Sequence, residues 1–220
     1  SIDNVSVREV GQDWTFTSGA TLTDIGAKIT HTPTAGSIAQ LSVLTIGKQY
    51  KLTYEITESI SGGLKFNSAV DASMVTTVGV HTKYFEADGT TAVIGRTSAT
   101  DNDVTITNIS VKEVGQNWDL GDGWSIGEDK AVAVSGSATK LQQTISGLSG
   151  KKCSVTFTLS DYQGTDLVLL DFGSTSGQSI TANGTYTEIG TYDQNYFQLY
   201  KGANFSGNIT NISVIEITDD

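Results

Sequence analysis

The chain has 220 residues, which is enough for two domains of ordinary size that each bury a core. Its 24 Asp and Glu residues against 13 Lys and Arg residues give a formal net charge of −11, which repels nucleic-acid phosphates and anionic membrane surfaces. Because of this charge we expect no nucleic-acid partner. No apolar run approaches the ~18–20 residues of a transmembrane helix, so we expect no membrane insertion.

One segment occurs three times along the chain. Ile2–Trp14 recurs almost unchanged as Ile106–Trp118, and its first part returns as Ile209–Ile217. A repeat at a constant interval is typical of a tandem array of one structural module. Because the last copy stands at the end of the sequence, we expect the repeated segment to be the closing strand of each module. Residues 1–10 then close a preceding module, residues 11–114 form module one and residues 115–220 form module two.

Most of the remaining sequence has the pattern of β-strands. Val, Ile, Thr and Ser are frequent, 24 glycines punctuate the chain, and proline occurs once, at Pro33. This composition favours an all-β fold. Glycine turns introduce segments with alternating apolar residues, the mark of strands buried on one face. In chain order, we predict strands at 26–31, 47–56, 64–70, 77–86, 91–96, 127–134, 150–159, 167–172, 186–192 and 196–200.

The closing strand has an irregular apolar spacing. Its second copy places apolar residues at Ile106, Ile109, Val111 and Val114, and its third copy repeats this spacing. A regular strand cannot keep residues three apart on one face. We therefore predict one β-bulge near Asn108 and Asn211, and another near Glu113 and Glu216.

Tryptophans open each module directly after the closing strand. Trp14 and Trp118 occupy matching positions, and Trp124 follows in module two. One interpretation is structural, with each ring covering an end of the sandwich; the other is a platform that stacks on sugars. We favour the structural interpretation, because the position recurs in both modules beside the junction strand.

The combination of a Trp-rich opening, the strand Gly-Lys-Gln-Tyr-Lys-Leu-Thr-Tyr beginning at Gly47, and the closing Ile-Asp-Asn-Val-Ser-Val-Arg-Glu-Val resembles carbohydrate-binding-module-like jelly rolls. Strings of such modules are similar to those of bacteriophage structural and tail-fibre proteins. The resemblance implies an all-β fold of two tandem jelly-roll β-sandwich modules. Family members often hold a structural calcium, but Asp3 is replaced by Thr107 and Thr210 in the other copies, so no calcium site is assigned and no other cofactor is expected.

A candidate glycan-binding face lies in module two. Alternation along 196–200 places Phe197 and Leu199 inward and Tyr196, Gln198 and Tyr200 together on the outer side. Aromatic rings beside amide groups suit a sugar, which needs stacking surface and hydrogen bonds. The alternative interpretation, which the sequence supports equally, is that these tyrosines are ordinary surface residues of an antiparallel sheet. We expect neighbouring loops to add Asp161, Tyr162, Gln163 and Tyr192, whereas the comparable segment 92–96 of module one has no aromatic ring.

Catalysis finds little support in the sequence. His31 and His81 have no cysteine partner and no metal-ligand spacing, and no pair of acids can be nominated among the many carboxylates. Cys153 alternates with Val155 and Phe157, which indicates a buried thiol. The protein is therefore expected not to be an enzyme.

The sequence and its resemblance together favour a non-enzymatic, viral or extracellular role. The preferred interpretation is a phage appendage or virion segment that binds host surface glycans and contacts other virion proteins or copies of itself. Two alternatives remain: a purely structural spacer or capsid decoration, and the accessory carbohydrate-binding region of a secreted polysaccharide-degrading enzyme. The sequence does not identify the glycan.

Overall fold

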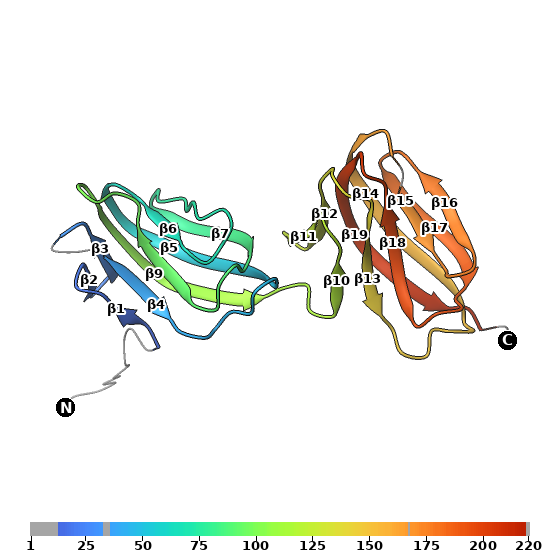
Figure 1. The fold of residues 1–220 in the computed structure, drawn as a ribbon, viewed down its shortest axis with the longest axis horizontal. Helices are drawn as coiled ribbons and strands as arrows, with labels where there is room; N and C mark the ends of the chain where they lie inside the picture. The colour runs from blue at the N-terminus through green and yellow to red at the C-terminus, as the bar shows by residue number, and fades with distance from the viewer. Residues whose placement is uncertain (1–12, 33–35, 167, 219–220) are drawn as a thin grey trace, which may run out of the picture. The chain divides into compact units, whose positions relative to one another are not determined.

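The computed structural model describes residues 13–32, 36–166 and 168–218, and all of their regular structure is β-strand (Figure 1). The strands form four antiparallel sheets, so the prediction of an all-β fold is confirmed. No described segment forms a helix of the length and hydrophobicity needed to cross a bilayer. The chain divides into two compact units, Ser1–Val114 (unit one) and Gly115–Asp220 (unit two). The closing strand expected at residues 1–10 lies outside the described residues.

Unit one contains two sheets. The first has the spatial order β2 (Ala20–Thr23), β3 (Gly26–Thr30), β9 (Asp103–Glu113), β5 (Gln49–Ser61) and β7 (Gly79–Glu86). The second has the order β1 (Thr15–Phe16), β4 (Ser37–Gln40), β8 (Ala92–Arg96) and β6 (Leu64–Phe66).

Unit two repeats this plan with one additional edge strand. The sheet that contains β14, called here the β14 sheet, has the order β11 (Trp124–Gly127), β12 (Lys130–Ala133), β19 (Phe205–Glu216), β14 (Lys152–Gly164) and β17 (Gly184–Thr191). The β18 sheet has the order β10 (Trp118–Leu120), β13 (Thr139–Thr144), β18 (Tyr196–Lys201), β15 (Val168–Asp171) and β16 (Ser176–Ile180). Only β16 has no counterpart among the described strands of unit one.

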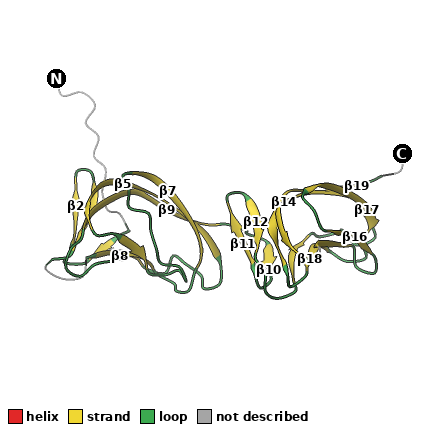
Figure 2. Ribbon diagram, turned by 90° about the horizontal axis from the view of Figure 1, so that it is seen from above, coloured by secondary structure: helices red, strands yellow, loops and turns green. Residues whose placement is uncertain are grey.

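The two sheets of each unit lie face to face. Figure 2 shows β8 opposite β5 and β9 in unit one, and β18 opposite β14 and β19 in unit two. This is a β-sandwich arrangement, and the strand order is compatible with the jelly roll expected from the sequence. Each unit has its own core cluster of apolar side chains between its sheets.

The predicted alternation is confirmed in the long central strand of each unit. In β14, Cys153, Val155, Phe157 and Leu159 are all buried, and the residues between them are half-buried. The corresponding residues of β5 behave in the same way. The glycine turns before the two strands are also present: Gly47 and Gly150 have φ values of +80° and +83°, a left-handed conformation that glycine adopts at little cost.

The first predicted bulge is present and the second is not. Asn108 and Asn211 have positive φ values of 50° and 52°, and the pairing register shifts beside both of them. This bulge lets Ile106 and Ile109, three residues apart, both face the core. Glu113 and Glu216, however, pair in regular register at the ends of their strands. The prediction of a bulge there was wrong, because the strand simply ends before the next apolar residue.

Several predicted strands are shorter or divided. The segment 127–134 contains a turn at Glu128 and Asp129, so that β11 and β12 form a hairpin, and 64–70 is a strand only as far as Phe66. The other predicted strands agree with the structure to within a few residues. Short strands such as β1, β4 and β10 have too few residues to show an alternation, and we did not predict them.

Candidate functional site

The strand β18 separates its side chains as the alternation predicts. Phe197 and Leu199 are fully buried in the core of unit two, whereas Tyr200 is 40 % exposed and Tyr196 is half-buried. Gln198 shares the outer side of the strand but is only 7 % exposed. Its amide Nε2 donates a hydrogen bond to Asp171 Oδ2 at 2.9 Å. The tyrosine rings therefore offer most of the accessible surface of this strand, and Gln198 offers little.

Neighbouring strands extend this outer surface into rows of side chains. In the middle row, Asp119 of β10, Gln142 of β13, Gln198 of β18 and Asp171 of β15 pair in sequence across the sheet. On one side of this row Thr144 lies opposite Tyr196, and on the other Lys140 lies opposite Tyr200. We call the set Lys140, Gln142, Asp171, Tyr196, Gln198 and Tyr200 the β18 platform. It combines a polar centre with one tyrosine at each end, about 13 Å apart along the strand.

The sequence analysis missed the contributions of β13 and β15 to this surface. Lys140, Gln142 and Thr144 do alternate with the buried Leu141, a pattern typical of a half-buried strand. That pattern could have predicted the strand. It could not have shown that β13 and β15 flank β18, because strand pairing between distant segments is decided by the tertiary fold.

Asp161, Tyr162 and Gln163 do not join the platform. They lie near the end of β14, which belongs to the opposite sheet of the sandwich. Asp161 has a φ of 54° and stands where the register between β14 and β19 shifts, and its carboxylate accepts a hydrogen bond from Asn208 Nδ2 at 2.5 Å. The expectation that this segment neighbours β18 is therefore corrected.

The side chain of Tyr162 has a packing role. Its ring lies 5.8 Å from the ring of Phe205, centre to centre, and its hydroxyl donates to the carbonyl of Asp166 at 3.0 Å. Gln163 is exposed beside it and pairs with Ser206 of β19. These contacts anchor the end of β14 and account for the tyrosine without a ligand.

Tyr192 is also excluded from a ligand surface. Its side chain is fully buried, and its ring packs 5.0 Å from that of Phe172. Burial raises the pKa of its hydroxyl far above the ordinary value. The assignment of Tyr192 to a glycan site is corrected for this reason. The sequence could not separate it from Tyr196, because the two tyrosines flank the same polar turn, residues 193–195.

The equivalent surface of unit one has a different character. In β8, Ala92 and Ile94 are fully buried, and Val93 and Gly95 take the outer positions that Gln198 and Tyr200 occupy in β18. The segment carries no aromatic ring. The tyrosine pair of the β18 platform is thus a property of unit two.

The three tryptophans pack against the cores. Trp14 and Trp118 are partly buried against the core clusters of their units, and Trp118 meets Phe197 edge to face at 5.9 Å. Trp124 is buried, with its ring centre 6.4 Å from that of Phe205. These contacts support the structural interpretation of the tryptophans.

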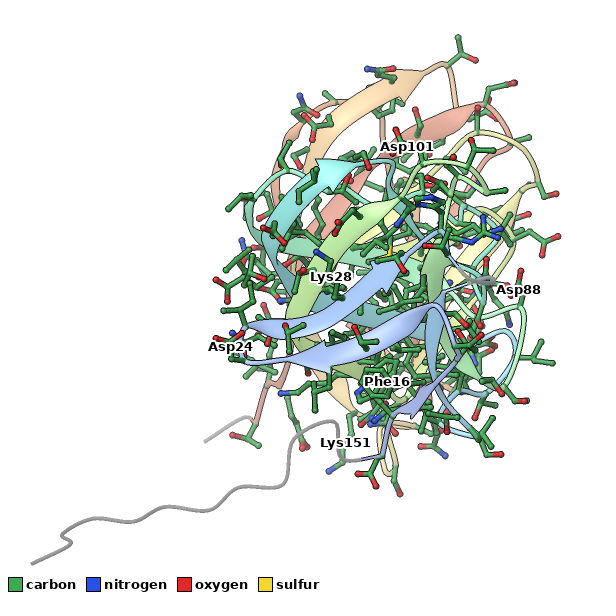
Figure 3. The ribbon with its side chains drawn as sticks, turned by 90° about the vertical axis from the view of Figure 1, so that its left-hand side faces the viewer. Phe16, Asp24, Lys28, Asp88, Asp101 and Lys151 are labelled. Carbon is green, nitrogen blue, oxygen red and sulfur yellow. The ribbon has the colours of Figure 1, made fainter. Side chains whose placement is uncertain are left out.

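A small hollow occurs beside the closing-strand bulge in each unit. In unit one it measures about 270 Å³ and its lining includes Phe16 of β1 and Asp24 of the β2–β3 turn, both labelled in Figure 3. In unit two a hollow of about 300 Å³ is lined by Trp118, Ile126 and Asn211 among others. Because the hollow recurs beside the same bulge and the same tryptophan, we attribute it to their packing.

The two histidines contact backbone atoms, and the cysteine is buried. His31 Nδ1 lies 3.3 Å from the backbone nitrogen of Asn102, and His81 Nε2 lies 2.6 Å from the carbonyl oxygen of Thr77. Cys153 is buried, as predicted, and burial raises the pKa of its thiol. No group of three or more His, Cys, Asp or Glu side chains within residues 13–32, 36–166 and 168–218 could hold a metal ion.

The β18 platform is thus the arrangement in the described chain that most resembles a binding surface, because an exposed and a half-buried tyrosine share one sheet face with half-buried polar side chains. In comparisons with known proteins, no protein-family model and no curated protein matches the chain.

Proposed function

We propose that this chain is a non-enzymatic glycan-binding segment of a virion or cell-surface appendage, in which unit two contacts a host surface glycan through the β18 platform. The observation that carries the proposal is the pair Tyr196 and Tyr200 on the outer side of β18, with the amide and carboxylate groups of Gln142 and Asp171 between them. The appendage role rests on the tandem repeat and on the resemblance of its closing segment to phage modules.

The physical basis is stacking combined with hydrogen bonding. A sugar ring presents an apolar C–H face and a rim of hydroxyls, so it needs a flat aromatic surface with polar groups beside it. The two tyrosine rings supply that surface, and a separation of about 13 Å suits a short oligosaccharide lying along the strand. The hydrogen bond that Gln198 Nε2 donates to Asp171 Oδ2 orients this carboxylate at the β15 end of the middle row.

A glycan array probed with the full chain tests this proposal. We expect Tyr196→Ala and Tyr200→Ala each to lower the affinity for a bound glycan about tenfold, because one stacked ring contributes on the order of 1–2 kcal/mol. Tyr84→Ala is the matched control, since this tyrosine of β7 also lies under a lysine, with Lys51 Nζ 5.6 Å from its ring centre. The control variant should bind glycan as the parent chain does.

Two results would contradict the proposal. If the full chain binds no glycan on the array, the spacer interpretation replaces it. If glycan binds but both platform tyrosine variants retain full affinity, the binding surface lies elsewhere in the chain.

A further inference from the structure

The side chain of Lys140 places a positive charge on the β18 platform. Lys140 lies opposite Tyr200, and its ammonium Nζ donates to Gln142 Oε1 at 2.8 Å. The same nitrogen lies 5.9 Å from the ring centre of Tyr196. The lysine therefore reaches from the Tyr200 end of the platform across its middle row toward the other tyrosine.

This charge has no carboxylate partner among the described residues. The ion pairs found among the described residues involve Lys28, Lys83, Lys130 and Lys151. The acid of the platform is already engaged: the two oxygens of Asp171 accept hydrogen bonds from the backbone nitrogen of Gly173 at 2.8 Å and from Gln198 Nε2 at 2.9 Å. Asp119, the other acid of the middle row, lies opposite Gln142 in the register of β10 and β13, and no ion pair between it and Lys140 occurs among the described residues.

An unpaired ammonium on a binding surface discriminates between ligands. It has three N–H donors, of which Gln142 uses one. A neutral glycan would partly remove its water shell and offer only neutral acceptors, whereas an anionic group forms a charge-assisted hydrogen bond, roughly twice as strong as a neutral one. The net charge of −11 repels anions at long range, but physiological salt screens charges that lie more than about 8 Å away. The charge of Lys140, which would contact the ligand directly, therefore decides whether the platform prefers anionic or neutral glycans.

We propose that the ligand of the β18 platform is an anionic glycan, with a carboxylate or sulfate group on Lys140 Nζ and sugar rings on Tyr196 and Tyr200. This inference rests on the proposed glycan-binding function and names its substrate class. It also assigns Lys140 as the residue that determines specificity.

Matched neutral and charged polysaccharides test this assignment. The probes are polygalacturonate against its methyl ester, for carboxylate, and dextran sulfate against dextran, for sulfate, alongside an array that carries neutral and acidic glycans. We expect the full chain to bind at least one charged member about three- to tenfold more tightly than its neutral counterpart, the range between an exposed ion pair and a charge-assisted hydrogen bond. This difference should shrink as sodium chloride is raised.

Substitutions of Lys140 test whether this residue causes the preference for charged probes. Lys140→Gln should abolish the preference for charged probes and leave the binding of neutral ones unchanged, and Lys140→Arg should retain the preference. Lys51→Gln is the control, because it removes the same charge from a lysine–tyrosine contact that lies outside the platform, between β5 and β7 of unit one. It should behave as the parent chain does.

The outcomes separate this inference from the function on which it rests. Binding of neutral glycans alone, or equal loss of charged-probe binding in Lys140→Gln and Lys51→Gln, overturns the anionic assignment and leaves glycan binding intact. Binding to no glycan of any kind overturns both.

Discussion

Phe197 and Tyr200 lie three residues apart on one strand but in opposite environments. Phe197 is fully buried between the sheets, and Tyr200 is 40 % exposed on the platform. We expect Phe197→Ala to lower the free energy of unfolding by roughly 3–5 kcal/mol, because it leaves a cavity in a close-packed core. Tyr200→Ala should change it by no more than about 0.5 kcal/mol. Chemical denaturation of both variants checks this, and a destabilised Tyr200→Ala with an unaffected Phe197→Ala would mean that the facing is inverted.

Lys201 is the next residue of β18 and is a buried cation. Its side chain is fully buried, and Nζ donates to the carbonyls of Val134 at 3.0 Å and Ser137 at 2.8 Å. Desolvation lowers its pKa below the ordinary value of 10.5 for lysine. Between the lowered pKa and 10.5 the unfolded chain binds more protons than the folded one, so this residue's contribution to stability increases as pH rises through that interval.

Lys201→Met tests the sign of this pH dependence. The variant loses two hydrogen bonds and leaves two carbonyl acceptors buried, so it should be less stable than the parent by about 2 kcal/mol near neutral pH. Because the variant lacks the titrating group, the stability difference should widen in favour of the parent as pH is raised toward about 10. Equilibrium unfolding at several pH values measures this difference, and a difference that narrows with rising pH contradicts the assigned direction.

The closing strands β9 and β19 show how one irregular residue determines an element. Asn211 is exposed and has a φ of 52°, a region that asparagine tolerates and β-branched residues avoid. The bulge at this residue returns Ile212 and Val214 to the core side of the strand. A regular strand of the same sequence would turn them toward solvent.

The effect of a substitution at Asn211 on stability should therefore depend on how readily the new residue adopts a positive φ, and not on the size of its side chain. Asn211→Val is expected to destabilise unit two by about 1–2 kcal/mol, whereas Asn211→Gly should be close to neutral. Ser213→Val is the control on the same strand, where regular pairing with Thr156 favours a β-branched residue. Thermal unfolding of the three variants checks the order, and equal effects of valine at both positions would contradict it.

Each of the two units of the whole molecule has its own core. The core cluster of unit two contains only residues between Trp124 and Ile209, and its packed neighbours run from Trp118 to Val214. We expect the fragment 115–220 to fold alone, with a melting temperature within a few degrees of the corresponding transition in the full chain, because its core cluster consists of its own residues. Calorimetry and circular dichroism of the fragment measure this. An unfolded fragment would show that unit two depends on the rest of the chain.

Local patterns account for much of what could be predicted. The alternation of Cys153, Val155, Phe157 and Leu159 identified a strand buried on one face, and the three-residue step from Ile209 to Ile212 located the bulge. Both depend on the period of side chains along a single strand, which any stretch of sequence displays. The second bulge was predicted wrongly at Glu216, because the same three-residue step also arises where a strand ends.

The sequence by itself determined the all-β class, the tandem repeat and the direction in which Phe197 and Tyr200 face, because these follow from composition, recurrence and two-residue periodicity. Only the tertiary structure decided which strands are neighbours. It placed Lys140 and Asp171 beside β18, assigned Asp161 to the opposite sheet and buried Tyr192. The physical reason is that pairing between distant strands is selected by how two sheets close around one core, a condition on the whole unit that no single segment carries.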